Sequence, residues 1–317
     1  MAHERSSSQP FESHCMSVTP VETDTAARED ARRGFLFALS AYMLWGFLPF
    51  YLKAVAHIPV LEVLAHRILW SVPLTLALLL WLKRTDELKR ALREPRTLAM
   101  AALTASIISV NWGVYVYAIV SGQALAGALG YYINPLFSIF LGAVLLGEKL
   151  TRPQWVAIAL ATAAVLLLGW ENGGLPWISL SLAVSFGFYG FFKKTLPIEP
   201  TQGFLLEIIL LTPLALALAV WIVVSGTSHF GPTGAGDVLL LMLSGLVTAV
   251  PLILYGNGAK RLRLSTLGIM QYIAPTIVFL IAVFLFREPF TPATALAFGM
   301  IWAALAIYSA SLLRRKR

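Results

Sequence analysis

The sequence predicts an all-α polytopic membrane protein whose ten transmembrane helices form two inverted five-helix repeats. Three observations carry this prediction. The chain of 317 residues is 58% hydrophobic and only 13% charged, about half the charged fraction of a soluble domain. The motif YINP at residues 132–135 recurs as YIAP at 272–275, an offset of 140 residues. Lysine and arginine gather almost entirely on one side of the predicted membrane.

Ten apolar segments are long enough to cross a bilayer, which takes about 20 residues each. In chain order they are residues 34–56, 60–82, 97–119, 122–146, 153–170, 176–194, 202–225, 237–258, 265–287 and 292–313. The first five make up one repeat, residues 34–170, and the last five make up a second, residues 176–313. Because each repeat holds an odd number of spans, the two copies must lie in opposite orientations, as in many secondary transporters.

The two ends of the chain are polar. Residues 1–33 are rich in Ser, Thr, Arg and acidic residues and predict a disordered cytoplasmic tail. This stretch has no apolar core that would indicate a cleavable signal peptide, and the sequence leaves open whether Met1 or Met16 is the true start. Residues 314–317 predict a basic cytoplasmic C-terminus. The single cysteine, Cys15, lies in the tail, so neither a disulfide framework nor a thiolate metal site is expected.

The distribution of basic residues orients the spans. With the N-terminus inside, the cytoplasmic segments near the membrane hold 20 Lys and Arg residues, and the outer segments hold only Lys53 and Arg287. The loop 83–96 is basic, whereas its counterpart in the second repeat, 226–236, has no Lys or Arg. This charge reversal is what inverted repeats predict. The positive-inside rule therefore places both termini in the cytoplasm.

Five stretches of the chain resemble one family of transporters. They are residues 62–71 (EVLAHRILWS), 111–112 (NW), 129–136 (LGYYINPL), 261–268 (RLRLSTLG) and 271–276 (QYIAPT). Together they resemble the RarD branch of the EamA-type drug/metabolite transporter superfamily over residues 34–313. The resemblance implies ten helices in two inverted five-helix repeats around a central cavity in the inner membrane. It also implies export of metabolites, amino acids or drugs.

Ionisable side chains within the spans are the first candidates for a substrate site, because each costs at least about 2.5–3.5 kcal/mol on insertion scales. Glu62, His66 and Arg67 lie on the second span, and Glu207 lies on the seventh. In one interpretation Arg67 anchors an anionic substrate, with Glu62 or His66 as its partner or as a proton carrier. In the other, Arg67 forms a structural ion pair with Glu62 or Glu207, and His66 is a hydrogen-bonded packing histidine.

Charged residues at the span ends have simpler interpretations. The side chains expected to snorkel towards the lipid headgroups are Lys53, Lys193 and Lys194. Glu148 and Glu288 each precede a threonine by three residues, and each threonine lies next to a proline that can open the next helix. This pattern favours helix capping around a tight turn.

The repeated proline predicts a hinge in each repeat. Pro135 and Pro275 each remove a backbone donor within an apolar span, and a neighbouring side chain or a cavity must satisfy the freed carbonyl. A pair of kinks would let the two helices bend in alternation. Asn134 precedes the first proline, whereas Ala274 precedes the second, so the amide is expected to line the cavity in one repeat only.

Aromatic and amide side chains predict the wall of a substrate cavity. The residues expected to line it are Asn111, Trp112, Tyr131 and Gln271, together with Asn134. Tyr131 and Gln271 occupy equivalent positions in the two repeats. At such mismatches the substrate is expected to be recognised, because a shared scaffold does not require them. An offset of 141 residues adds His66 opposite Glu207 as a further mismatch.

The predicted function is a secondary active transporter that moves a small metabolite or drug across the inner membrane by alternating access. The charges suggest proton coupling or a zwitterionic substrate. A membrane-embedded lipid-linked group transferase and a passive channel are the alternatives. No P-loop or metal-ligand spacing is present in the sequence, so enzymatic activity, a cofactor and a metal are not expected. The expected partners are a small molecule, the bilayer and, if coupled, protons, whereas nucleic acid is not expected and the oligomeric state is open.

Overall fold

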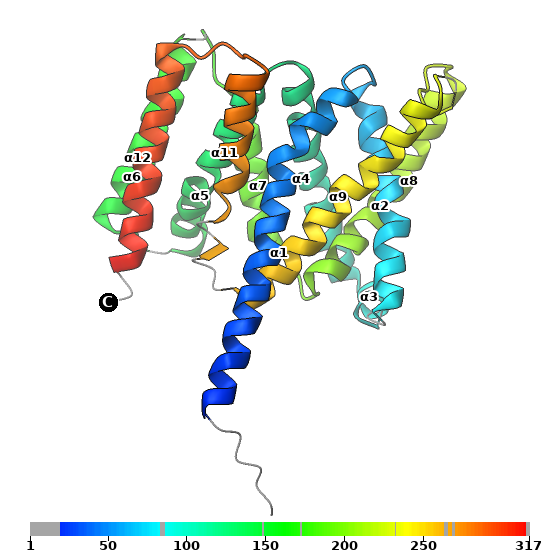
Figure 1. The fold of residues 1–317 in the computed structure, drawn as a ribbon, viewed down its shortest axis with the longest axis horizontal. Helices are drawn as coiled ribbons and strands as arrows, with labels where there is room; N and C mark the ends of the chain where they lie inside the picture. Colours follow the sequence, from blue (N-terminus) through cyan, green and yellow to red (C-terminus); the bar gives the residue numbers. More distant parts are fainter. Residues whose placement is uncertain are drawn as a thin grey trace, which may run out of the picture.

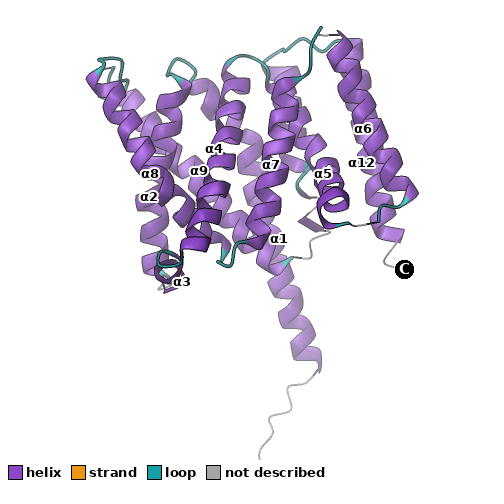
Figure 2. Ribbon diagram, turned by 180° about the vertical axis from the view of Figure 1, so that it is seen from behind, coloured by secondary structure: helices purple, strands orange, loops and turns teal. Residues whose placement is uncertain are grey.

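The computed structural model describes residues 20–82, 86–147, 149–171, 173–231, 233–262, 266–267 and 270–314. These residues form helices joined by short loops, as Figure 2 shows. Eight of the helices are long and apolar enough to cross a membrane. The chain is therefore a multi-pass, all-helical membrane protein.

The first half of the chain forms five long helices and one short one. They are α1 (Pro20–Ala54), α2 (Val60–Trp81), α3 (Asp86–Ala91), α4 (Pro95–Val120), α5 (Ala124–Leu146) and α6 (Arg152–Glu171). Pro95 sits in the first turn of α4, where its missing N–H costs nothing. Gly147 ends α5 with a φ of 66°, a left-handed conformation that glycine adopts without steric cost.

The second half follows the same order of helices. They are α7 (Trp177–Thr195), α8 (Pro200–Val224), α9 (Ala235–Arg261), α11 (Ile273–Leu280) with its π-helical continuation η1 (Ile281–Leu285), and α12 (Pro292–Arg314). At the start of α12, the N–H of Thr294 donates to Oγ1 of Thr291 at 3.1 Å. Thr291 therefore caps this helix, in agreement with its position before a proline.

Three helices differ from the predicted spans. Helix α1 begins at Pro20, so residues 20–33 of the predicted disordered tail are helical, and residues 1–19 lie outside the described part. The predicted span 176–194 forms α7, which is not among the eight helices apolar enough to cross a membrane. The predicted span 265–287 is interrupted by a turn at 271–272 before the short apolar segment Ile273–Leu285.

Most of the close helix pairs join a helix of the first half to a helix of the second half. α1 runs along α9 and α4 runs along α7, while α5 packs on α7 and α11 packs on α1. α2 packs on both α8 and α9. α6 and α12 pack on one another at one side of the molecule, where Figure 1 shows them next to α5. The chain ends of α1 and α12 and the short helix α3 lie at the same end of the bundle.

A carboxylate from the second half caps a helix of the first. Glu288 accepts hydrogen bonds from the backbone N–H groups of Ala124 (2.7 Å) and Leu125 (2.8 Å) at the start of α5. The sequence pattern was correct in predicting a cap, but it placed the cap at the local turn. The partner lies far away in sequence because α5 and η1 are neighbours in space. Glu148, the repeat counterpart, lies outside the described residues.

This cap is expected to make stability depend on pH. Burial raises the pKa of the Glu288 carboxyl, against the opposing effects of the Leu125 and Ala124 N–H groups and of Lys53. A carboxyl with a raised folded-state pKa contributes stability that is complete below its unfolded pKa and is lost as pH rises through the folded pKa. The unfolding free energy of wild type minus that of Glu288→Gln should therefore be largest below the unfolded pKa of about 4.3 and fall as pH rises through the raised folded-state pKa. Denaturant unfolding of both proteins in detergent measures this difference, and a difference that rises with pH would contradict it.

Candidate functional site

Arg67 is a buried cation held by neutral groups. Its side chain lies on α2 and is 4% exposed. Its Nε donates to Oγ1 of Thr248 on α9 at 3.0 Å, and its guanidinium carbon lies 5.2 Å from the ring centroid of Trp112 on α4. Its Nη1 is buried and makes no hydrogen bond to any of the described residues. The guanidinium therefore has an open donor inside the protein.

Close packing of α2 on α9 positions this arginine. A Cβ at Gly245 would overlap the backbone of Trp70, so glycine is required where the two helices touch. Ser71 Oγ donates to the backbone oxygen of Arg67 at 2.6 Å and lies 3.3 Å from the carbonyl oxygen of Gly245. This contact places Arg67 opposite Thr248.

The structural ion pair, one of the two interpretations of Arg67, is wrong. Neither Glu62 nor Glu207 contacts the guanidinium, because each carboxylate has other partners. The titratable side chains around Arg67 are tyrosines, namely Tyr51, Tyr115 and Tyr131, which are uncharged near neutral pH. A hydrogen bond to a charged group contributes about 1.5–3 kcal/mol and a desolvated cation–π contact about 2 kcal/mol. These contacts offset part of the several kcal/mol that burying an ion costs.

A hydrogen-bonded group of amide and hydroxyl side chains joins three helices beside this cation. Asn111 on α4 donates to Ser185 Oγ (2.9 Å) and to the Leu182 carbonyl oxygen (3.2 Å) on α7. Tyr131 on α5 donates to Asn111 Oδ1 at 3.0 Å. Three of the predicted wall residues, Asn111, Trp112 and Tyr131, thus lie on the helices around Arg67. Trp112, the neighbour of Asn111 on α4, contacts the guanidinium directly and places this group beside it.

Glu207 forms a second buried centre, away from Arg67. Its carboxylate receives hydrogen bonds from Lys193 Nζ (2.7 Å), Thr104 Oγ1 (2.7 Å) and Tyr189 OH (3.3 Å). The side chain of Lys193 is 21% exposed and that of Glu207 is 2% exposed. The snorkelling interpretation of Lys193 is therefore wrong, because its ammonium is held by a carboxylate inside the bundle.

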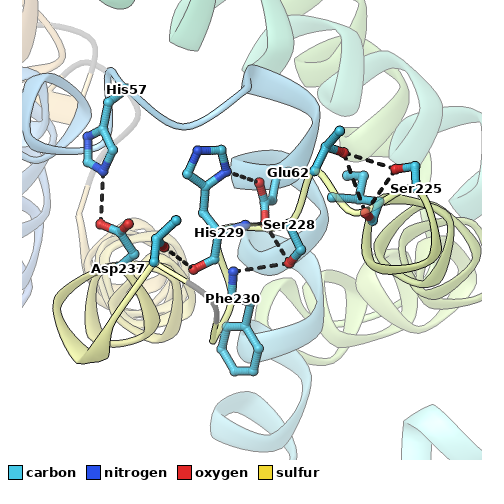
Figure 3. A network of polar contacts seen from close by, with 10 residues as sticks. His57, Glu62, Ser225, Ser228, His229, Phe230 and Asp237 are labelled. Atoms are coloured by element: carbon cyan, nitrogen blue, oxygen red, sulfur yellow. Dashed lines mark hydrogen bonds and ion pairs between the residues drawn. The ribbon is translucent and has the colours of Figure 1, made fainter.

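Glu62 lies in the first turn of α2 and is bound by the loop between α8 and α9, as Figure 3 shows. Its Oε1 accepts from the His229 backbone N–H at 2.7 Å and from Ser228 Oγ at 3.2 Å. Its Oε2 lies 2.8 Å from Nδ1 of His229. Glu62 is only 1% exposed. It is therefore a loop anchor and not the partner of Arg67.

His66 has the surroundings of a packing histidine. Its Nδ1 accepts from Trp70 Nε1 at 3.2 Å, and its ring stacks on Phe230 with centroids 4.8 Å apart. The alignment of the two repeats places His66 opposite Glu207, but no contact joins these two side chains in the described structure. His66 instead joins α2 to the α8–α9 loop.

The remaining predicted residues lie on α5 and its repeat counterpart. Asn134 is buried and accepts from Ser138 Oγ on its own helix at 3.0 Å, so it does not join the Asn111 cluster. Pro135 lies within the continuous helix α5, whereas Pro275 lies in the first turn of α11, just after a break. Gln271 lies in the turn at that break. The two prolines therefore occupy different local structures.

The sequence reasoning missed the residues that bind the buried charges. These are Thr104, Lys193, Thr248, Ser228 and His229. Threonine and serine occur widely in apolar spans, so only one signal was available. His229 is the lone ionisable residue between 226 and 236 in a loop without Lys or Arg, and it could have been predicted to contact a carboxylate.

Comparisons with known proteins agree with this architecture. Residues 32–170 match the EamA-like transporter family. The chain is 42% identical to the protein RarD of Streptomyces exfoliatus over 291 residues, covering 92% of each chain. It is 41% identical to RarD of Escherichia coli (strain K12), covering 88% of this chain and 95% of the relative.

Two further comparisons extend the match. The uncharacterized transporter YojE of Bacillus subtilis is 40% identical, with coverage of 91% of this chain and 97% of that protein. A solved crystal structure shares the fold with a TM-score of 0.57 and 22% identity, covering 89% of this chain and 98% of that one. The relatives named as transporters and the membrane-spanning helices show a membrane transporter. The chain belongs to the RarD family of EamA-type transporters.

Proposed function

We propose that this chain is a secondary active transporter for small molecules that carry a carboxylate. Substrate binds at Arg67, and two inverted five-helix repeats rock to expose that site to one side of the membrane at a time. One observation carries the proposal. A guanidinium that is 4% exposed, with no partner for Nη1 and no carboxylate against it in the described part of the chain, is ready to bind an anion.

The surroundings of Arg67 suit an organic anion better than a small inorganic ion. Trp112 offers a large aromatic face beside the guanidinium, and Tyr131 with Asn111 offers hydroxyl and amide groups. A substrate with a carboxylate and an apolar or aromatic body would use all of these groups at once. Residues Asn111, Trp112 and Tyr131 are therefore the proposed specificity groups.

The helix pairing supports inverted repeats of residues 34–170 and 176–313. Exchange of each helix with its counterpart turns the pair α1–α9 into α7–α4 and the pair α5–α7 into α11–α1, all of which pack together. The pairs α2–α8 and α6–α12 map onto themselves. Such a two-fold pattern is what a rocking mechanism needs. Pro135 and Pro275 are the proposed hinges within it.

The proposed location is the inner membrane, with both termini in the cytoplasm. The basis is the excess of Lys and Arg on that side. The N-terminal end of α1, the C-terminal end of α12 and the helix α3 lie at the same end of the bundle, as this orientation requires. Proton coupling belongs to the same proposal, because buried carboxylates at Glu62 and Glu207 are groups that can carry a proton.

Counterflow in proteoliposomes tests the proposal. A thermal-shift screen of carboxylic and amino acids on purified protein first identifies a ligand. Labelled ligand is then expected to accumulate against its gradient when vesicles are loaded with excess unlabelled ligand, because alternating access exchanges one molecule for another. A channel would show no such overshoot. A screen in which amines or neutral compounds bind and carboxylates do not would overturn the assignment of Arg67.

A further inference from the structure

The loop between α8 and α9 is anchored to α2 through one carboxylate. Ser228 Oγ and the backbone N–H of His229 both donate to Oε1 of Glu62, at 3.2 Å and 2.7 Å. The imidazole of His229 occupies the other oxygen at 2.8 Å. Glu62 and His229 are 167 residues apart in sequence, so these contacts join the two halves of the chain (Figure 3).

The anchored loop covers the outer half of α2. Phe230, which follows His229, stacks on His66 with centroids 4.8 Å apart and lies 6.1 Å from the ring of Trp70. Phe230 N–H donates to Ser228 Oγ at 3.0 Å, so its position depends on the residue that binds Glu62. His66 directly precedes Arg67 in the chain. Release of the loop would therefore uncover the helix face next to the proposed substrate anchor.

His229 connects this buried carboxylate with the solvent. Its side chain is 23% exposed, whereas the side chain of Glu62 is 1% exposed. Its Nδ1 faces Glu62, and its Nε2 makes no hydrogen bond among the described residues. An imidazole with one nitrogen on a carboxylate and the other free can carry a proton from one side to the other.

Other titratable groups face this pair from the neighbouring elements. His57 in the α1–α2 loop binds Asp237 of α9 at 2.8 Å, and its ring centroid lies 6.2 Å from that of His229. His66 lies one turn below Glu62 on the same helix. The His57–Asp237 pair is the more exposed, with His57 at 52%. His57, Asp237 and His66 make no contact with Glu62 in the described structure.

We propose that Glu62 and His229 form a proton-binding site that controls release of the loop segment 225–230. A proton from the outer solution binds Nε2 of His229, and the proton on Nδ1 passes to Oε2 of Glu62. The carboxyl and the imidazole are then both neutral, and no other group changes charge. The Ser228 and His229 donors lose a charged acceptor, which makes their hydrogen bonds about half as strong. Protonation therefore favours the open loop.

Hydrogen–deuterium labelling tests this site without any substrate. The backbone N–H of His229 donates to Glu62 and is protected from exchange while the loop is closed. Its exchange rate in detergent is divided by the intrinsic rate of an unstructured amide at the same pH, which cancels the effect of pH on the exchange chemistry. From about pH 8 to about pH 5 this ratio is expected to rise about tenfold, the factor that corresponds to about 1.4 kcal/mol.

Three matched variants make the test specific. Glu62→Gln should give a high ratio at every pH, because an uncharged side chain imitates the protonated state. Glu171→Gln, the same change at an exposed position on α6, should behave as wild type. His57→Gln should keep the pH response. A low ratio in Glu62→Gln, a pH response that persists in it, or loss of the response in His57→Gln would each overturn the proposal.

This inference depends on the proposed transport function only for its consequence, the opening of the outer face. If Glu62→Gln does not fold, the pH titration of the protein that keeps Glu62 still tests the proposal. A ratio that does not change with pH in that protein contradicts it. Failure of carboxylates to bind at Arg67 would leave the labelling result unaffected. Failure of the labelling test would likewise leave the Arg67 site standing.

Discussion

Replacing Arg67 with methionine is expected to remove binding of carboxylate ligands while the protein stays folded. Truncating one partner of a buried, hydrogen-bonded charge pair costs about 2–5 kcal/mol, so affinity should fall at least about thirtyfold. Methionine keeps much of the side-chain volume against Trp112. The measurement is ligand titration by thermal shift or calorimetry on wild type and variant.

The stability of the same variant separates function from structure. Arg67 has no carboxylate partner among the described residues, so its removal leaves no buried anion behind. The melting temperature of Arg67→Met should therefore equal or exceed that of wild type. A structural ion pair would instead predict a loss of about 3–5 kcal/mol. Arg152→Ala, at an exposed position on α6, is the control for loss of a positive charge, and it should leave both affinity and stability unchanged.

Replacing Lys193 with methionine is expected to have the opposite signature, a large loss of stability. It leaves the carboxylate of Glu207, 2% exposed, with only the hydroxyls of Thr104 and Tyr189 as partners. Breaking a buried pair from one side costs about 3–5 kcal/mol, because an uncompensated charge remains. Denaturant unfolding in detergent measures this loss.

A double-mutant cycle shows whether the loss comes from the pair. Lys193→Met combined with Glu207→Gln removes both charges, and most of the lost stability should return, since replacing a whole buried pair is often nearly neutral. The coupling energy obtained from the four proteins isolates the interaction. If the double variant is as unstable as the sum of the single variants, the two side chains act independently, and the ion pair contributes nothing measurable.

Sequence reasoning identified the charged residues correctly but not their partners. Arg67, Glu62 and Glu207 stand out because charge at bilayer depth is costly. Their pairing was wrong, since it was inferred from which charges were available. In the structure Glu62 binds the α8–α9 loop and Glu207 binds Lys193. Those choices depend on how each helix is rotated about its own axis, and the amino-acid composition does not determine that rotation.

Helix capping also shows which contacts the sequence predicts and which ones only the fold decides. The spacing of Glu288 and Thr291 predicted capping groups, and Thr291 does cap α12 locally. Glu288 caps α5, more than 160 residues away. A threonine just before the first residue of a helix has a short side chain, which reaches only the backbone N–H groups of that helix. A glutamate has a longer side chain, so its partner is decided by whichever helix end the fold brings near.

The sequence by itself determined that this chain is a multi-pass membrane protein of a known transporter family, where most of its helices lie, and that Glu62, Arg67 and Glu207 lie within them. These properties follow from local hydrophobicity and from motifs along the chain, and they need no knowledge of contacts. Only the tertiary structure decided that Arg67 faces Thr248 and Trp112, with no carboxylate partner among the residues that the structure describes, and that His229 reaches Glu62. Those contacts join helices and loops distant in sequence, so they exist only once the helices have packed.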